Sequence, residues 1–164
     1  AGAGVMAVGH SNPLVVDKVK QQLDKFTHTL DFPNPIRKQL VERLLSVLPK
    51  GLNKVFFGGP TGSDAIEAAM KLAKLNTGRF GFISFEGGYH GMTSGALSLT
   101  SDNYHRNGLQ PLLPSICFIP YAYCYRCAFG HKKETCKLPS IRQEAIKQNL
   151  RKLSIITALI RQNI

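Results

Sequence analysis

A glycine-rich turn that leads into an alanine-rich segment is the first place in this sequence where residue types and spacing could do chemistry. The turn is Gly59-Pro60-Thr61-Gly62-Ser63. At the start of a helix, its backbone N–H groups and the hydroxyls of Thr61 and Ser63 would converge on the positive end of the helix dipole, which suits a phosphate. The turn is neither a P-loop nor a G-x-G-x-x-G fingerprint. Taken alone, it is explained equally well by a hydroxyl that only caps the helix.

A second glycine-rich turn, Glu86-Gly87-Gly88-Tyr89-His90-Gly91, follows the apolar run Phe80–Phe85. In open α/β sheets the carboxyl ends of the strands form the edge where ligands bind. Tyr89 at that edge could cover a flat heterocycle whose phosphate lies on the first turn. Taken singly, Tyr89 is a half-buried rim residue and His90 a structural histidine. The two turns together favour a ligand site.

Three of the four cysteines fall in one short segment, which also contains a histidine. The possible ligands are Cys124, Cys127, His131 and Cys136. Such a set could form a tetrahedral zinc site, although structural zinc sites usually pair two separated ligand couples. Reduced structural thiols are the favoured interpretation, and Cys117 is expected in the core. So few cysteines indicate a reducing cytoplasm rather than a secreted disulfide scaffold.

The elements that must position these residues alternate between helices and strands. Apolar residues at helical spacing predict helices from Pro13 to Phe26, from Ile36 to Leu48 and from Asp64 to Leu75, with a short helical stretch ending at Leu99 and a helix over Leu138–Leu153. Short apolar runs predict strands at Lys54–Phe57, Phe80–Phe85 and Ser115–Ile119. The first two strands and the helix between them predict a βαβ unit, and therefore an α/β fold with a parallel sheet covered by helices.

Composition excludes several classes of protein. The chain has 164 residues, of which 43% are hydrophobic and 19% charged, as expected for one globular α/β domain. It lacks the run of roughly 20 apolar residues that a membrane-spanning helix needs. The net charge of +11 is spread along the chain. A solvated basic face, or a face for an acidic partner, is therefore favoured over specific nucleic-acid binding.

The stretch FFGGPTGSDAIEAAMKLAKLNTGRFGFISFEGGYHGMTSGALSLT resembles the cofactor-binding region of class III aminotransferases, which are pyridoxal-5'-phosphate (PLP) enzymes of fold type I. The motifs TGSDAIEAAMKLA and FEGGYHGMT carry the resemblance, which runs from Ala1 to about Arg142 and is greatest for the diaminobutyrate branch. It implies an incomplete part of the large domain. Residues 1–53 would be a helical lead-in, residues 54–142 the PLP-binding part with a cysteine loop at 121–137, and residues 143–164 a divergent or truncated tail.

The resemblance also implies roles for particular residues. Thr61, Gly62 and Ser63 would hold the cofactor phosphate, Tyr89 would stack on the pyridine ring, and His90 would lie beside the cofactor. Glu67 would support the site from the same helix as Ser63. The intact enzyme would move an amino group from an ω-amine donor, such as 2,4-diaminobutyrate, to a 2-oxo acid, and would be a cytoplasmic homodimer.

No catalytic residue is assigned, because the family's Schiff-base lysine and the aspartate that pairs with the pyridine nitrogen have no counterpart in this sequence. The chain alone is therefore expected to be inactive, and a truncated or frame-shifted gene is one hypothesis for its origin. Two alternatives stay open. One is a basic, non-enzymatic binding module whose cysteine loop holds zinc, and the other is a phosphate-ligand binding protein without catalysis.

Overall fold

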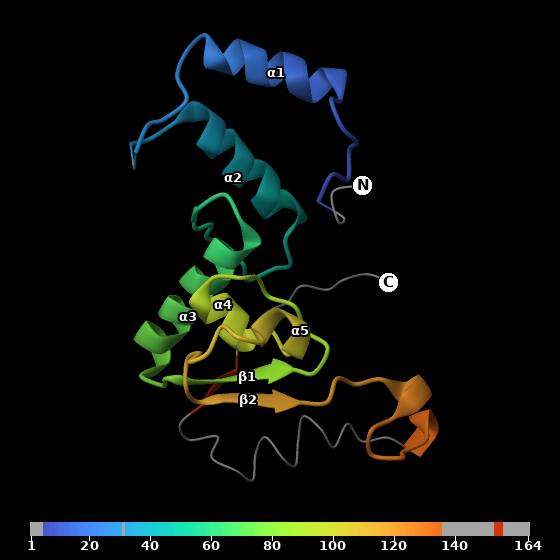
Figure 1. The fold of residues 1–164 in the computed structure, drawn as a ribbon. Helices are drawn as coiled ribbons and strands as arrows, with labels where there is room; N and C mark the ends of the chain where they lie inside the picture. The colour runs from blue at the N-terminus through green and yellow to red at the C-terminus, as the bar shows by residue number, and fades with distance from the viewer. Residues whose placement is uncertain (1–4, 31, 136–152, 156–164) are drawn as a thin grey trace. The chain divides into compact units, whose positions relative to one another are not determined.

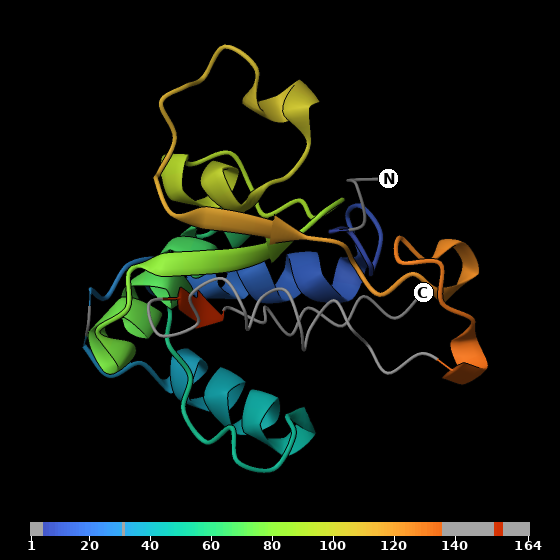
Figure 2. The same cartoon turned by 90° about the horizontal axis from the view of Figure 1, so that it is seen from below.

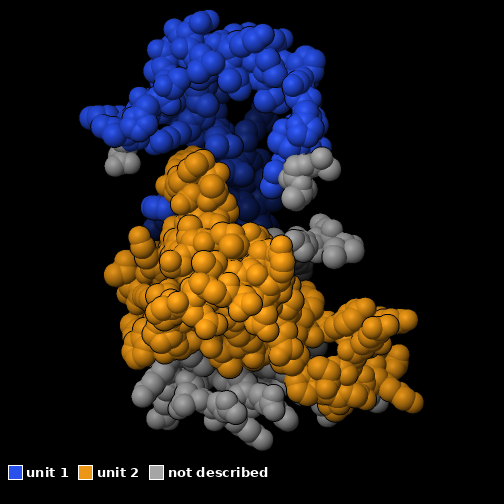
Figure 3. All heavy atoms as spheres, in the orientation of Figure 1, with its two compact units in different colours: residues 1–56 blue, residues 57–164 orange. Residues whose placement is uncertain are grey.

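A computed structural model describes residues 5–30, 32–135 and 153–155 of the chain. The chain divides into two compact units, residues 1–56 and residues 57–164 (Figure 3). Each unit is described by itself.

Unit 1 contains two amphipathic helices, α1 (Pro13–Leu23) and α2 (Pro35–Val47). Each begins with a proline preceded by an asparagine cap, which is a favourable start because proline lacks the N–H that the first turn leaves unpaired. The side chain of Asn12 accepts from Leu14 N at 3.1 Å, and that of Asn34 accepts from Ile36 N at 2.8 Å. Both predicted helices are confirmed.

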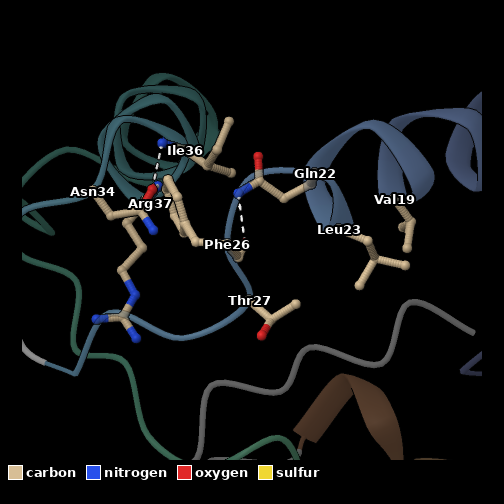
Figure 4. Close-up of a pocket in the computed structure, with 8 residues that line it drawn as sticks. All are labelled: Val19, Gln22, Leu23, Phe26, Thr27, Asn34, Ile36 and Arg37. Carbon is tan, nitrogen blue, oxygen red and sulfur yellow. Dashed lines mark hydrogen bonds between the residues drawn. The ribbon is translucent and has the colours of Figure 1, made fainter.

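A cavity of about 310 Å³ lies between α1 and α2 (Figure 4). It is lined by Val19, Gln22, Leu23, Phe26, Thr27, Asn34, Ile36 and Arg37. Two of the polar groups are already engaged locally, since Gln22 Nε2 donates to Phe26 O at 2.9 Å and Asn34 Oδ1 caps α2. Four of the eight lining residues are apolar, and none is an acid, a cysteine or a histidine.

Unit 2 opens with the longest described helix, α3 (Gly62–Thr77). Thr61 is its N-cap, and the helix ends at Gly78, whose φ of 65° is in the left-handed region that glycine adopts without strain. Two residues of α3, Ile66 and Met70, are buried. The helix predicted over Asp64–Leu75 is confirmed.

In the described residues of unit 2, three parallel strands form a sheet in the order β2-β1-β3. They are β1 (Gly81–Phe85), β2 (Ile116–Ile119) and β3 (Leu153–Ile155). Phe82 is in register with Ile116 of β2 and with Ser154 of β3. β1 and β2 lie side by side in Figures 1 and 2. The expected α/β class, with parallel strands and helices, is confirmed.

The short helices α4 (Ser94–Leu99) and α5 (Asn103–Arg106) lie between β1 and β2 in the chain. Together with α3, α4 packs on the face of β1 that carries Phe82, in a buried cluster of Ile66, Met70, Phe82, Ala96 and Leu99. Figure 1 shows α3 and α4 on the same side of β1 and β2. Ile83 and Ile119 form a second buried cluster, as expected from the alternation of side chains along a strand. Beyond β2, the chain forms the 3₁₀ turns η2 (Cys124–Arg126) and η3 (Lys133–Thr135).

The strand predicted at Lys54–Phe57 is wrong, and so is the βαβ unit built on it. The segment has no regular structure, and Phe56 is 78% exposed. A strand is held by hydrogen bonds to a neighbour, and none of the three described strands pairs with this segment. The βαβ unit forms one step later in the chain, as β1, α4 with α5, and β2. The helix predicted over Leu138–Leu153 lies outside the described residues, except that Leu153 begins β3.

Among the helices of the described ranges, none combines the length and the apolar character that crossing a membrane would need.

Candidate functional site

The start of α3 is fixed by a capping box between Thr61 and Asp64. Thr61 donates from its hydroxyl to Asp64 Oδ2 at 2.7 Å and from its backbone N–H to the same oxygen at 3.1 Å, while Asp64 N donates back to Thr61 Oγ1 at 3.3 Å. These bonds hold the pKa of Asp64 below its ordinary value. The capping role considered for Thr61 is thus observed. The N–H groups of Gly62 and Ser63 have no partner among the described residues and point out of the first turn.

Ser63 joins this helix start to the second glycine-rich turn. Met92 N donates to Ser63 Oγ at 3.3 Å, although 29 residues separate them in sequence. Gly91 lies against the same hydroxyl, and a Cβ at Gly91 would overlap Ser63 Oγ. With a φ of 122°, Gly91 also has a backbone conformation that other residues rarely adopt. The two motifs of the sequence therefore meet in one place.

The two residues that follow α4 hold the second turn by hydrogen bonds. Gly87 N donates to Ser101 Oγ at 2.7 Å, and Ser101 N donates to Gly88 O at 3.0 Å. The buried hydroxyl of Thr100 accepts from His90 N at 2.9 Å. The backbone of the turn is thus fixed at three points, as a preorganised ligand site needs.

Glu67, one turn further along α3, caps α4. Its Oε1 accepts from Thr93 Oγ1 at 2.7 Å, from Gly95 N at 2.8 Å and from Ala96 N at 3.3 Å. The N-cap residue Thr93 makes no side-chain cap of its own, so the carboxylate satisfies N–H groups that the helix leaves unpaired. The negative charge also lies at the positive end of α4.

Tyr89 and His90 lie in the same turn but in different surroundings. Tyr89 is 57% exposed, so its ring can cover a ligand. His90 is half-buried, its Nδ1 is buried without a hydrogen-bond partner, and burial lowers the pKa of its imidazole. A neutral imidazole is therefore the form that this environment favours.

The structure adds two residues that sequence reasoning missed, Asp102 and His105. The ring of His105 lies edge-on to that of Tyr89 with centroids 5.0 Å apart, and His105 Nδ1 is 3.1 Å from Asp102 Oδ2. From the sequence, His105 belonged to no constellation. An Asp-x-x-His spacing at the start of a short helix was the available signal, and it is a weak one.

These residues fit a flat, phosphorylated ligand. Two free N–H groups and the remaining hydroxyl hydrogen of Ser63 can donate to a phosphate at the positive end of α3, while an exposed aromatic ring stands on the neighbouring turn. The five predicted site residues, Thr61, Gly62, Ser63, Tyr89 and His90, all lie in unit 2, on two turns that the Ser63–Met92 hydrogen bond joins. Of the three residues predicted to bind the phosphate, Thr61 already donates its hydroxyl hydrogen to Asp64.

The aminotransferase class-III family model matches residues 1–160. This chain belongs to the class III aminotransferase family. The fold and the meeting of the two motifs are those expected for this family from the sequence resemblance.

Among curated class III relatives, the chain is 47% identical over 132 residues to diaminobutyrate–2-oxoglutarate aminotransferase of Haemophilus influenzae, covering 79% of this chain and 29% of that protein. It is 44% identical over 135 residues to the enzyme of the same name from Rhizobium meliloti, with the same two coverages. The chain thus spans less than a third of the length of these relatives.

A solved aminotransferase structure is similar in fold to most of this chain. The taurine:2-oxoglutarate aminotransferase of Bifidobacterium kashiwanohense, in complex with PLP and glutamate, superposes with a TM-score of 0.65 at 28% identity, covering 71% of this chain and 27% of that one. The Bifidobacterium enzyme therefore has PLP bound in its crystal structure.

The cysteine loop forms no metal site in the part of the chain that the structure describes. No group of three or more His, Cys, Asp or Glu side chains there is arranged to hold a metal ion. Cys117, Cys124 and Cys127 are free, and Cys124 is exposed. Cys136, the fourth residue of the possible zinc set, lies outside the described residues.

Proposed function

We propose that this chain is the PLP-binding part of a class III aminotransferase that transfers an amino group from an ω-amine donor, 2,4-diaminobutyrate, to a 2-oxo acid. The observation that carries the proposal is the hydrogen bond from Met92 N to Ser63 Oγ. This bond links the start of α3, which suits a phosphate, to the turn that carries the Tyr89 ring. The names of the two bacterial relatives support the choice of donor and acceptor.

In this proposal the residues of the two turns bind and orient the cofactor. The N–H groups of Gly62 and Ser63, with the Ser63 hydroxyl, hold the phosphate, and the dipole of α3 favours its negative charge. Tyr89 covers one face of the pyridine ring, and the half-buried, neutral His90 borders it without adding a positive charge. PLP, when bound, supplies an electron sink for bond changes at the amine carbon of the substrate.

We further propose that these 164 residues bind PLP without transaminating, because the sequence contains no counterpart of the family's cofactor-linked lysine. The whole protein, by this proposal, is a homodimer in a reducing cytoplasm. The small number of cysteines in the sequence supports the choice of compartment. The zinc-holding module gains no support from the described residues and is not proposed.

A titration of the chain with PLP, followed by ³¹P NMR and ligand absorbance, tests the proposal. We expect saturable binding that weakens about tenfold in Ser63→Ala, the loss of one good hydrogen bond to a charged group. Ser46→Ala, on α2 in unit 1, is the matched control and should bind as the unmodified chain does. Binding that does not saturate, or equal affinities for the two variants, would show the proposal to be wrong.

A further inference from the structure

Tyr89 has one aromatic neighbour in the described part of the chain, and that neighbour is His105. The two ring centroids are 5.0 Å apart and the planes are inclined by 61°, which is the edge-to-face geometry that aromatic pairs prefer. The Tyr89 ring is otherwise largely exposed, with 57% of its surface open. An exposed tyrosine rotates freely about its side-chain bonds unless a neighbour restricts it.

Besides Tyr89, two side chains contact His105, those of Asp102 and Tyr104. Asp102 Oδ2 lies 3.1 Å from His105 Nδ1, and because a carboxylate can only accept, the hydrogen lies on Nδ1. The ring of Tyr104, the preceding residue, also contacts that of His105, with the centroids 5.2 Å apart and the planes perpendicular. Asp102 in turn is fixed by its second oxygen, since Oδ1 caps α5 by accepting from Tyr104 N at 2.9 Å.

The backbone that carries Asp102 is fastened to the turn that carries Tyr89. Thr100 Oγ1 accepts from His90 N, and Ser101 exchanges two hydrogen bonds with Gly87 and Gly88. The hydrogen bonds therefore flank Tyr89 on both sides, and on the other segment they involve the two residues that directly precede Asp102. Such a connection lets α5 set where His105 stands relative to Tyr89.

We infer that Asp102 and His105 are positioning residues that hold the Tyr89 ring in the orientation with which it covers a bound ligand. His105 makes the ring contact, and Asp102 fixes the plane of the imidazole. The part of this inference that concerns PLP rests on the proposed function. The contact between the two rings does not, so the two can be tested separately.

The first measurement uses the whole chain without cofactor, labelled with ¹³C in tyrosine and histidine. We expect a nuclear Overhauser effect between the ring protons of Tyr89 and His105, and a single preferred χ1 rotamer for Tyr89. In His105→Ala the χ1 of Tyr89 should average over rotamers, whereas His105→Phe should keep one rotamer. If the effect is missing in the unmodified chain, the inference is overturned, and this holds even if His105→Ala does not fold.

The second measurement is the PLP dissociation constant of the same variants. His105→Ala should raise it about three- to tenfold, as the worth of one aromatic pair implies, and His105→Phe should restore it. His105→Ala added to Tyr89→Ala should have no further effect, because His105 acts through Tyr89. Asp102→Asn, which keeps an acceptor oxygen, should cost less than Asp102→Ala. His28→Ala, an exposed histidine of unit 1, is the control.

The outcomes separate the two claims. If His105→Ala leaves the dissociation constant unchanged, or weakens Tyr89→Ala as much as the unmodified chain, the positioning role is overturned while the proposed function stands. If the unmodified chain shows the ring contact but binds no PLP, the proposed function fails. The contact is then upheld and its effect on the cofactor is overturned.

Discussion

Glu67 and Gly95, which are 28 residues apart in the sequence, are joined by a hydrogen bond of 2.8 Å from the Gly95 backbone to the Glu67 carboxylate. One side chain of α3 thereby holds the beginning of α4, and α4 leads into Thr100 and Ser101, which bond to the second glycine-rich turn. Thr93, the N-cap residue of α4, makes no side-chain cap, and the Glu67 side chain of α3 supplies it instead.

Replacing Glu67 with alanine should destabilise the chain by about 2 kcal/mol, because the buried N–H groups of Gly95 and Ala96 lose their acceptor. Glu67→Gln keeps an acceptor oxygen and should cost less than about 1 kcal/mol. Urea unfolding measures both. Glu86→Ala, at an exposed carboxylate, is the control and should change stability by less than about 0.5 kcal/mol. Equal losses for Glu67→Ala and Glu86→Ala would contradict the capping role.

Gly91→Ala should be more damaging than an alanine at a comparable glycine. It combines an unfavourable φ of 122° with overlap on Ser63 Oγ, whereas Gly108 has a φ of 75° and open space around its Cα. We expect Gly108→Ala to cost about 1 kcal/mol and Gly91→Ala at least about 2 kcal/mol in urea unfolding. Adding Ser63→Gly should recover part of the Gly91→Ala loss. If the two alanine variants unfold at the same urea concentration, the close approach of Gly91 to Ser63 is not present in solution.

Asp64 should contribute to the acid sensitivity of the fold. Because its pKa is lower in the folded chain, its contribution to stability is complete above the ordinary aspartate pKa and is lost as the pH falls through the lowered value. Asp64→Asn should therefore flatten the dependence of the unfolding free energy on pH between about 5 and 2, the window in which an aspartate titrates. Asp17→Asn, an exposed position on α1, should leave the slope as it is. A steep acid slope that survives in Asp64→Asn would rule out this assignment.

His90 should make the fold less stable below neutral pH. Burial lowers the pKa of the folded imidazole, so the unfolded chain binds more protons, and stability falls as the pH drops through the ordinary histidine pKa of about 6.5. His90→Asn should remove this part of the pH dependence between about pH 7 and 5. His28→Asn, at an exposed histidine, serves as the comparison. The prediction fails if both variants lose stability over this range as the unmodified chain does.

The cysteine loop should carry no stoichiometric zinc. Protein purified without chelators and analysed by mass spectrometry of metals should contain far less than one zinc per chain, and Cys124→Ser with Cys127→Ser should unfold at the same temperature as the unmodified chain. One zinc per chain that disappears in this double variant would restore the binding-module alternative.

The sequence was sufficient where a local pattern determines structure. The alanine-rich stretch beginning at Gly62 and the apolar run ending at Phe85 became α3 and β1 because helix caps and strand patterns act over a few residues. Lys54–Phe57 has an equally good strand pattern and forms none, since a strand also needs a neighbour to pair with. The role of His105 could not be predicted from the sequence for a related reason. Its contact with Tyr89 depends on hydrogen bonds between the turn at Gly87–His90 and the residues Thr100 and Ser101, and these follow no short-range pattern.

The order β2-β1-β3 has a consequence for how the chain folds during its synthesis on the ribosome. β1 is the central strand, but its partner β3 is separated from it by the whole of α4, α5, β2 and the cysteine loop. While the ribosome is still translating that stretch, the backbone N–H and C=O groups on one edge of β1 do not yet have β3 to pair with. Pairing of β3 with β1 therefore comes after the pairing of β2 with β1 and closes a longer stretch of chain, which makes it the slower of the two steps.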